Sequence, residues 1–193
     1  SLVSGNVYSS LEISKTMDTN EKGEFEHWTL KEIYEQPIAL QRAINNGARL
    51  QGDYNSKLGG LETYAGSFSD ITNCLIIGCG TSHFAANIGV DYFRRLTAFD
   101  RVLSIDGCEF VEDDLPRSGK TLAILLSQSG ETRDLYNCLS ILKKRGIVTL
   151  GCVNVPDSLI AQEVDCGVYL NAGKEIGVAS TKSFTSQLVI LCL

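Results

Sequence analysis

The fold is decided by one stretch of the sequence, Leu122-Ala123-Ile124-Leu125-Leu126-Ser127-Gln128-Ser129-Gly130-Glu131-Thr132. Its first five residues form a short, wholly apolar run, which is typical of a strand buried on both faces of a parallel sheet. A helical pattern follows from about residue 130 to residue 144, and Gly146 is expected to end it. A polar loop therefore joins a buried strand to a helix.

The same strand-loop-helix order recurs on both sides of this stretch. Four further strands are predicted at residues 74–77, 102–105, 148–153 and 167–170. Helices are predicted at residues 82–95 and from about residue 181 onward. Five short apolar strands separated by helices indicate a three-layer α/β fold, with a five-stranded parallel sheet between helices. Right-handed crossovers favour the flavodoxin-like strand order 2-1-3-4-5, in which ligands bind beyond the carboxyl ends of strands 1 and 3.

Polar loops follow three of the predicted strands, namely Cys79-Gly80-Thr81-Ser82, Ser127 to Thr132 and Gly173 to Lys182. In the second loop, hydroxyls and an amide surround the first turn of a helix, where backbone N–H groups lack partners. A phosphate monoester suits that setting, because the amides, the hydroxyls and the helix dipole all favour an anion. Helix capping alone would also explain such residues. The loops after strands 1 and 3 should face each other, which favours a shared anion site.

Other ligand and reaction classes fit the loops poorly. Gly78-Cys79-Gly80 begins like a dinucleotide fingerprint, but His83 stands where the last glycine is needed. Ser129 lies outside a GxSxG elbow, so a serine hydrolase is disfavoured. Cys79 at a helix start is an alternative nucleophile, since that position can lower a thiol pKa, but no base accompanies it in the sequence.

Composition narrows the function further. Hydrophobic residues make up 44% of the 193 residues, which is enough for one globular domain, and the formal net charge is −6, which disfavours nucleic acid as a partner. No apolar stretch approaches the roughly 20 residues that cross a bilayer, so we expect no membrane contact and a cytoplasmic location. The two histidines are too few for a metal cluster. Seven cysteines without CxxC spacing are interpreted as buried, reduced thiols: Cys74, Cys79, Cys108, Cys138, Cys152, Cys166 and Cys192.

The N-terminal part has a different character. Residues 1–26 are polar and are interpreted as a lead-in or linker. Thr29 to Glu32 have the form of a capping box, which would start a helix whose apolar stripe comprises Leu30, Ile33, Tyr34, Leu40, Ala43 and Ile44. Pro37 is expected to kink or restart this helix, and Gly47 to stop it. Residues 51–70 should form a connection with some helix. The apolar run at residues 188–193 suggests a fragment of a longer protein.

At these loops the chain resembles the glutamine–fructose-6-phosphate aminotransferase family, specifically the first sugar isomerase (SIS) domain of its isomerase half. The resemblance covers about residues 24–193, and residues 27–193 are taken as this domain. The matching segments are His27-Trp28, Lys31-Glu32-Ile33, Glu35-Gln36-Pro37, Cys79 to Ser82, Ser127 to Thr132, Ala172-Gly173 and Glu175 to Lys182. The Ser127 to Thr132 loop recurs across SIS domains, whereas the first three segments and Glu175 to Lys182 are more specific.

The resemblance implies a role for each loop. Ser127, Gln128, Ser129 and Thr132 would hold the phosphate of fructose 6-phosphate, with Ser82 assisting. Thr81 would lie against the sugar. Contacts to the sugar hydroxyls would come from the third loop, at Val178, Ala179 and Ser180. The family aminates fructose 6-phosphate with ammonia from glutamine and isomerises the product to glucosamine 6-phosphate, for amino-sugar (UDP-N-acetylglucosamine) synthesis.

The resemblance also implies what this chain lacks. The family's catalytic lysine, glutamate and histidine lie in a second SIS domain and a C-terminal tail, and its glutaminase domain precedes this region. We therefore expect no catalytic residue, no cofactor and no metal here, and we expect the fragment alone to be inactive. Lys182 is interpreted as structural, and the role of His83, where the sequence departs from many relatives, stays open. The implied partners are the two sugar phosphates, those other domains and a second copy in a homodimer.

Two alternatives remain from the sequence. The first is a regulatory domain that senses a sugar phosphate, since SIS modules also serve in regulators. A DNA-binding helix-turn-helix before the module would favour it, and residues 1–26 show none. The second is an isomerase or deglycase acting on another sugar phosphate.

Overall fold

Five parallel strands form the centre of the fold. They are β3 (Ile71–Gly78), β4 (Arg101–Asp106), β5 (Lys120–Ser127), β6 (Val148–Val153) and β7 (Cys166–Tyr169). Their order in the sheet is β4-β3-β5-β6-β7, and every pairing is parallel. This is the predicted order 2-1-3-4-5. Strands β3, β4 and β5 extend by one to three residues beyond their predicted ends, β6 has the predicted bounds, and β7 begins and ends one residue earlier than predicted. The prediction of a three-layer α/β fold is confirmed.

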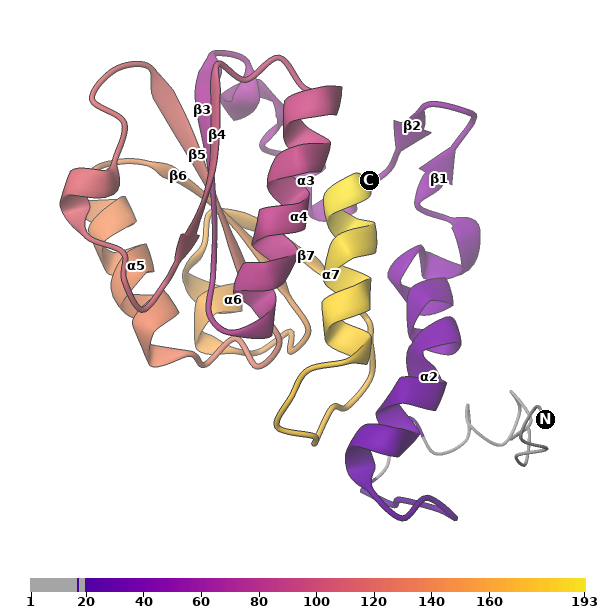
Figure 1. Ribbon diagram of the computed structural model, residues 1–193. Helices are drawn as coiled ribbons and strands as arrows, with labels where there is room; N and C mark the ends of the chain where they lie inside the picture. Colours follow the sequence, from indigo (N-terminus) through magenta and orange to yellow (C-terminus); the bar gives the residue numbers. More distant parts are fainter. Residues whose placement is uncertain (1–16, 18–19) are drawn as a thin grey trace.

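Helices cover both faces of the sheet in the computed structural model (Figure 1). One face carries α4 (Thr81–Leu96) and α7 (Lys182–Cys192), and the other carries α5 (Arg133–Lys144) and α6 (Leu159–Glu163). Side chains alternate along β3, so that Cys74 and Ile76 join the first core and Leu75 and Ile77 join the second. Because helices cover both faces of the sheet, the central part of each strand is apolar on both sides. These continuous apolar runs made the strands predictable from the sequence.

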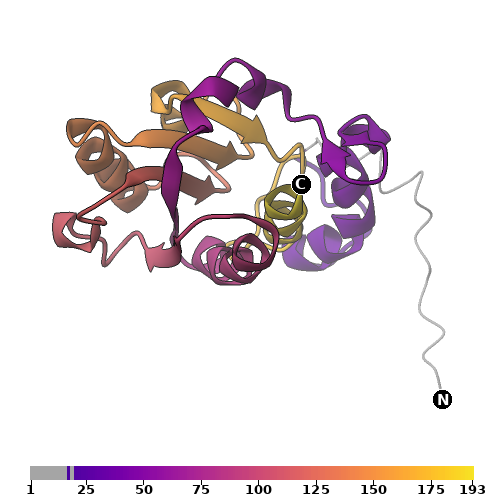
Figure 2. The same ribbon diagram turned by 90° about the horizontal axis from the view of Figure 1, so that it is seen from above.

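The structure describes residue 17 and residues 20–193. Most of the predicted lead-in at residues 1–26 therefore lies outside the described residues. Helix α2 (Trp28–Ala43) follows it and packs along α7, on the side away from the sheet (Figure 2). Shorter elements connect α2 to β3 or follow β4: η1 (Asn45–Gly47), β1 (Leu50–Gln51), β2 (Asn55–Ser56), α3 (Gly59–Glu62), η2 (Ala65–Phe68) and η3 (Glu112–Asp114). Helix α3 and η2 supply the short helix expected within residues 51–70.

The predicted apolar stripe of α2 is wrong for its first three residues, whereas Ala43 at its C-terminal end is buried as expected. Leu30, Ile33 and Tyr34 of the apolar stripe are 41%, 46% and 43% exposed. The buried face contains three charged residues and two alanines, of which only Ala43 belongs to the predicted stripe: Lys31, Glu32, Glu35, Ala39 and Ala43. Helix α7 presents the buried ammonium of Lys182 to this face, and the segment before α7 presents backbone N–H groups that donate to Glu32. Pairing with these groups therefore decides which face of α2 is buried, and the helical spacing of its apolar residues does not.

The predicted start of α2 is wrong, and so is the predicted restart at Pro37. The N-cap is His27, whose carbonyl accepts a hydrogen bond from the N–H of Lys31, so Thr29 lies inside the first turn. Glu32 does not reach back to the helix start. Helix α2 also runs through Pro37 without a restart. Proline leaves one carbonyl without its usual donor, and the side-chain amide of Gln36 donates to that carbonyl, of Ile33, at 3.1 Å.

Among the described residues, the helices are all too short or too polar to cross a bilayer.

Candidate functional site

Two of the three predicted loops leave the sheet at paired positions. Gly78, the last residue of β3, lies opposite Leu126 in β5. The segment Cys79 to Ser82 starts directly after the first strand, and Ser127 ends the second. Neighbouring strands lie about 4.8 Å apart, so both loops begin side by side at the carboxyl edge of the sheet. The structure thus brings these two loops together, as expected from the strand order.

The loop after β5 is closed by its own hydroxyl groups. The buried Ser127 Oγ accepts a hydrogen bond from the N–H of Gly130 at 2.9 Å and lies 3.3 Å from Thr132 Oγ1. Ser129 Oγ accepts from the N–H of Glu131 at 3.1 Å. Thr132 is the N-cap of α5, so the hydroxyls surround the start of a twelve-residue helix. The helix dipole places partial positive charge at this point.

Helix α5 starts later than predicted, because Gly130 cannot be helical. Its φ of 67° lies in the left-handed region, which costs other residues about 1–2 kcal/mol. The carbonyl of Gly130 also accepts from the N–H of Ile160 at 3.0 Å, and Glu131 Oε1 accepts from the N–H of Leu159 at 2.8 Å. Helix α6 is thereby fastened to the loop. The shape of the loop depends on residue 130 having no side chain.

The Gly130→Ala change tests this dependence. An added Cβ would lie 1.9 Å from Ser158 Oγ and 2.4 Å from Ser158 Cβ. Gly146 is a matched control, because its φ of 64° is similar but an added Cβ would meet nothing within 4 Å. We expect Gly146→Ala to cost about 1 kcal/mol of unfolding free energy and Gly130→Ala to cost clearly more, as measured by urea denaturation. Equal losses would contradict the importance of the contact with Ser158.

Residues Thr81 and Ser82 lie in the first turn of α4, after Gly80 as N-cap. Ser82 is buried, and its Oγ accepts a hydrogen bond from Gln187 Nε2 of α7 at 2.9 Å. This bond fixes the start of α4 against α7. Sequence reasoning missed Gln187, because no local pattern relates it to Ser82. His83 Nε2 lies 3.2 Å from Asn87 Nδ2, one helical turn further on.

The third loop lies at the same edge of the sheet, before α7 (Figure 1). Val178 and Ala179 are exposed, whereas Ser180 Oγ donates to Glu175 Oε2 at 2.8 Å. The other oxygen of Glu175 accepts from the N–H groups of Thr181 at 2.9 Å and Ser183 at 3.2 Å. One carboxylate therefore shapes the C-terminal half of this loop and the start of α7.

A second carboxylate shapes the other half of the same loop. Glu32 Oε1, from α2, accepts from the N–H groups of Ile176 at 2.5 Å and Gly177 at 3.0 Å. Sequence reasoning assigned Glu32 to a capping box and gave no role to Glu175. No local pattern marks either carboxylate, because the donors to Glu32 lie 144 or more positions away and Glu175 stands in an irregular loop. The two carboxylates can be identified as hydrogen-bond acceptors from the sequence, but the backbone N–H groups that donate to them cannot.

Lys182 is fully buried between α7 and α2. Its Nζ lies 2.6 Å from Glu35 Oε2 and also donates to the carbonyl of Lys174. Lys31 Nζ lies 3.1 Å from Glu35 Oε1, so two ammonium groups share one buried carboxylate. The structure agrees with a structural role for Lys182, because its amine is engaged in the interior.

The thiols are free in all seven cysteines. The prediction of burial is confirmed for Cys74, Cys138, Cys152 and Cys166. Cys79 is half-buried, and the prediction is wrong for Cys108 and Cys192, which are exposed.

The environment of Cys79 does not favour its thiolate form. Burial raises its pKa, and a hydrogen bond with Cys108 counters this only in part. The pKa of Cys108 is raised to about 12, chiefly by the hydrogen bond and charge of Cys79, and further by Asp134. The position of Cys79 just before α4 therefore does not lower the pKa of its thiol.

A hollow of about 820 Å³ lies at the opposite edge of the sheet, where charged side chains of both signs line it, including Glu112, Lys120 and Arg145. It surrounds the amino ends of β5 and β6. Ligands of open parallel sheets bind beyond the carboxyl ends, so the hydroxyl-rich loops remain the better candidate.

Comparison with known proteins gives a consistent result. A family model described as "SIS domain" matches residues 67–193. A protein of Acanthamoeba polyphaga mimivirus, named "Probable glutamine–fructose-6-phosphate aminotransferase (isomerizing)", is 46% identical over 167 residues, which are 86% of this chain and 27% of that protein. The glutamine–fructose-6-phosphate aminotransferase (isomerizing) of Aquifex aeolicus is 41% identical over 89% of this chain and 27% of its own length.

A solved structure is also similar. The C-terminal domain of glucosamine-fructose-6-phosphate aminotransferase from Francisella tularensis superposes with a TM-score of 0.79 and 33% identity. The match covers 90% of this chain and 48% of that chain. This chain therefore spans about a quarter of the curated relatives and about half of the solved domain.

Proposed function

The chain belongs to the SIS domain family, and from that premise we propose that it is the fructose-6-phosphate-binding part of the isomerase region of a glutamine–fructose-6-phosphate aminotransferase. The names of the similar proteins support this proposal. Within the whole enzyme, the product would be glucosamine 6-phosphate for amino-sugar synthesis.

The observation that carries the proposal is the hydroxyl-lined start of α5. Ser127, Ser129 and Thr132 surround the first turn of that helix. A phosphate monoester placed there accepts hydrogen bonds from N–H and O–H groups and meets the positive end of the helix dipole. No basic side chain is required, which suits a chain of net charge −6. We assign the phosphate to these residues, together with Gln128 from the same loop.

The sugar is assigned to the neighbouring loops. Thr81 and Ser82 begin α4 beside the phosphate loop, so they face the same ligand from the adjacent strand end. Ser82 is oriented by Gln187, and its hydroxyl keeps a proton to donate to the phosphate. The exposed residues Val178 and Ala179, with Ser180, are assigned to the sugar hydroxyls. Glu32 and Glu175 position that third loop through its backbone.

The chemistry itself is assigned outside this chain. Amination and isomerisation need a base that moves a proton between adjacent sugar carbons. The three loops offer hydroxyls, amides and a buried lysine that is already paired with Glu35. We therefore propose that this chain positions the substrate, that a second SIS domain and a glutaminase domain complete the enzyme, and that the enzyme is a cytoplasmic homodimer. Seven free thiols suit a reducing compartment.

A ligand series tests the assignment. Isothermal titration of the chain with fructose 6-phosphate and with unphosphorylated fructose should show binding only for the phosphate ester, because the helix start recognises the phosphoryl group. Inorganic phosphate should compete. Equal heats with fructose and fructose 6-phosphate, or no competition by phosphate, would contradict the proposal.

A further inference from the structure

The ends of β3 and β4 bring three potential metal ligands together. Gly78 lies opposite Asp106 in the register of these two strands. Cys79 is the next residue after Gly78, and Cys108 follows two positions after the end of β4. The thiols come from different strand ends, so no CxxC spacing marks them in the sequence. The sheet topology alone makes them neighbours.

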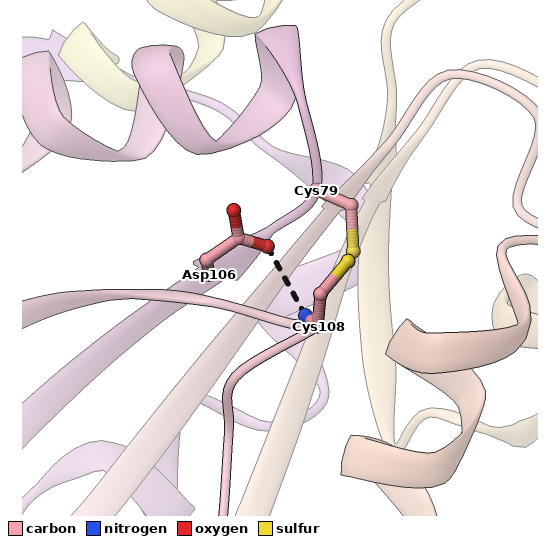
Figure 3. Close-up of side chains that lie close together, drawn as sticks. All are labelled: Cys79, Asp106 and Cys108. Atoms are coloured by element: carbon pink, nitrogen blue, oxygen red, sulfur yellow. Dashed lines mark hydrogen bonds between the residues drawn. The ribbon is translucent and has the colours of Figure 1, made fainter.

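The ligand atoms of these residues converge. The two sulfur atoms and a carboxylate oxygen of Asp106 all lie within 4.8 Å of one another, and Figure 3 shows the two thiols pointing toward each other beside that carboxylate. Tetrahedral zinc places sulfur and oxygen ligands roughly 3.5–3.8 Å apart, from Zn–S bonds of about 2.3 Å and Zn–O bonds of about 2.0 Å. Small side-chain rotations are enough to reach that spacing.

The backbone and a neighbouring helix hold the cluster in place. The N–H of Cys108 donates to Asp106 Oδ1 at 3.1 Å, which orients the carboxylate. Cys108 Sγ donates to Asp134 Oδ2 of α5 at 3.5 Å. Two carboxylates therefore adjoin two thiols near the surface, where Cys108 and Asp134 are exposed. This concentration of potential negative charge favours a cation, and the exposed side gives the cation access.

We propose that Cys79, Asp106 and Cys108 bind a thiophilic divalent cation, with zinc as the ion. Two thiolates and one carboxylate form a donor set that selects zinc or cadmium over magnesium or calcium. Asp134 is the adjacent charge that accepts hydrogen bonds around the ion, and water occupies the fourth position.

Binding of the ion is balanced by loss of protons. Cys79 and Cys108 are thiols before binding, so each releases one proton to solvent as its sulfur–metal bond forms, and no oxidation or reduction takes place. The ion would join β3 and β4 directly behind Gly80, the N-cap of α4. The site adjoins the hydroxyl-rich loop after β5, because Asp134 lies two positions after Thr132 in the first turn of α5. Its three proposed ligands are not among the residues assigned to the sugar phosphate, so the proposal does not depend on which sugar phosphate that loop takes.

Metal titration of the reduced chain tests this proposal. The chain is titrated anaerobically with Zn²⁺ in competition with a chromophoric chelator, and with Cd²⁺ to observe sulfur-to-metal charge-transfer absorption. We expect one ion per chain and a Cd²⁺ absorption that requires both thiols. Cys108→Ser and Asp106→Asn should each weaken the affinity by more than about 10-fold, the smallest effect usual for outer-shell partners. Cys192→Ser is the matched control, because it removes an exposed thiol elsewhere.

Three outcomes would overturn the proposal. One is equal affinity in Cys108→Ser and Cys192→Ser, with circular dichroism showing that both variants are folded. Another is Cd²⁺ uptake without charge-transfer absorption, which would indicate carboxylate ligands alone. The third is recovery of Cys79 and Cys108 as a disulfide from the anaerobically reduced chain.

Discussion

Replacement of Glu35 by glutamine is expected to lower the free energy of unfolding by about 3–5 kcal/mol, the usual result of removing one partner from a buried ion pair. Glu35 is the carboxylate that Lys31 and Lys182 share, at 3.1 and 2.6 Å, and all three side chains are at most 2% exposed. The amide would remove the negative charge that these two buried ammonium groups share. Urea denaturation followed by circular dichroism measures the effect.

Two controls separate the charge from the packing. Glu62 pairs with Lys57 on the surface at 3.6 Å, and Glu62→Gln should change the unfolding free energy by less than about 1 kcal/mol. Replacing all three buried residues with apolar ones of similar size, as Lys31→Met, Glu35→Leu and Lys182→Met, should restore most of the stability lost in Glu35→Gln. A loss below about 1 kcal/mol in Glu35→Gln would show that water reaches the group.

The combined change Ser129→Ala and Thr132→Ala is expected to weaken fructose 6-phosphate binding by about 2–4 kcal/mol, because two hydrogen bonds to a charged group are lost. Neither hydroxyl is an N-cap acceptor for α5, so the helix should keep its start. Titration calorimetry measures the affinity. Ser140→Ala serves as control, since that hydroxyl lies further along α5 and donates to the carbonyl of Tyr136. Unchanged affinity in the double variant would contradict the phosphate assignment.

The sheet could be predicted from the sequence because burial on both faces makes each strand continuously apolar. The run at residues 74–77 is one such case, and the five runs together with right-handed crossovers favoured the strand order that the sheet has. The positions of the hydroxyl loops followed from that order. The start of α5 was predicted too early because Gly130 adopts a left-handed conformation, which the sequence permits but does not require.

The buried face of α2 could not be predicted from periodicity. Leu30, Ile33 and Tyr34 have helical spacing, yet Lys31 and Glu35 are the buried residues. A buried charged residue needs a partner of opposite charge, and the partner that α7 supplies to Glu35, Lys182, is distant in the sequence. The same limit applies to Glu32 and to Gln187, whose partners lie on other elements. Contacts between distant segments decide these positions, and a single sequence does not show them.

The pairing of α2 with α7 has a consequence for synthesis of the protein. Glu35 and Lys182 are separated by 147 positions, so the first described helix leaves the ribosome long before its counterpart exists. The charged face of α2 stays hydrated during that time, and it can be desolvated only after α7 and the loop before it have been synthesised. We therefore expect α2 to be the last element to acquire protection from hydrogen exchange in the nascent chain, after the strands have already assembled.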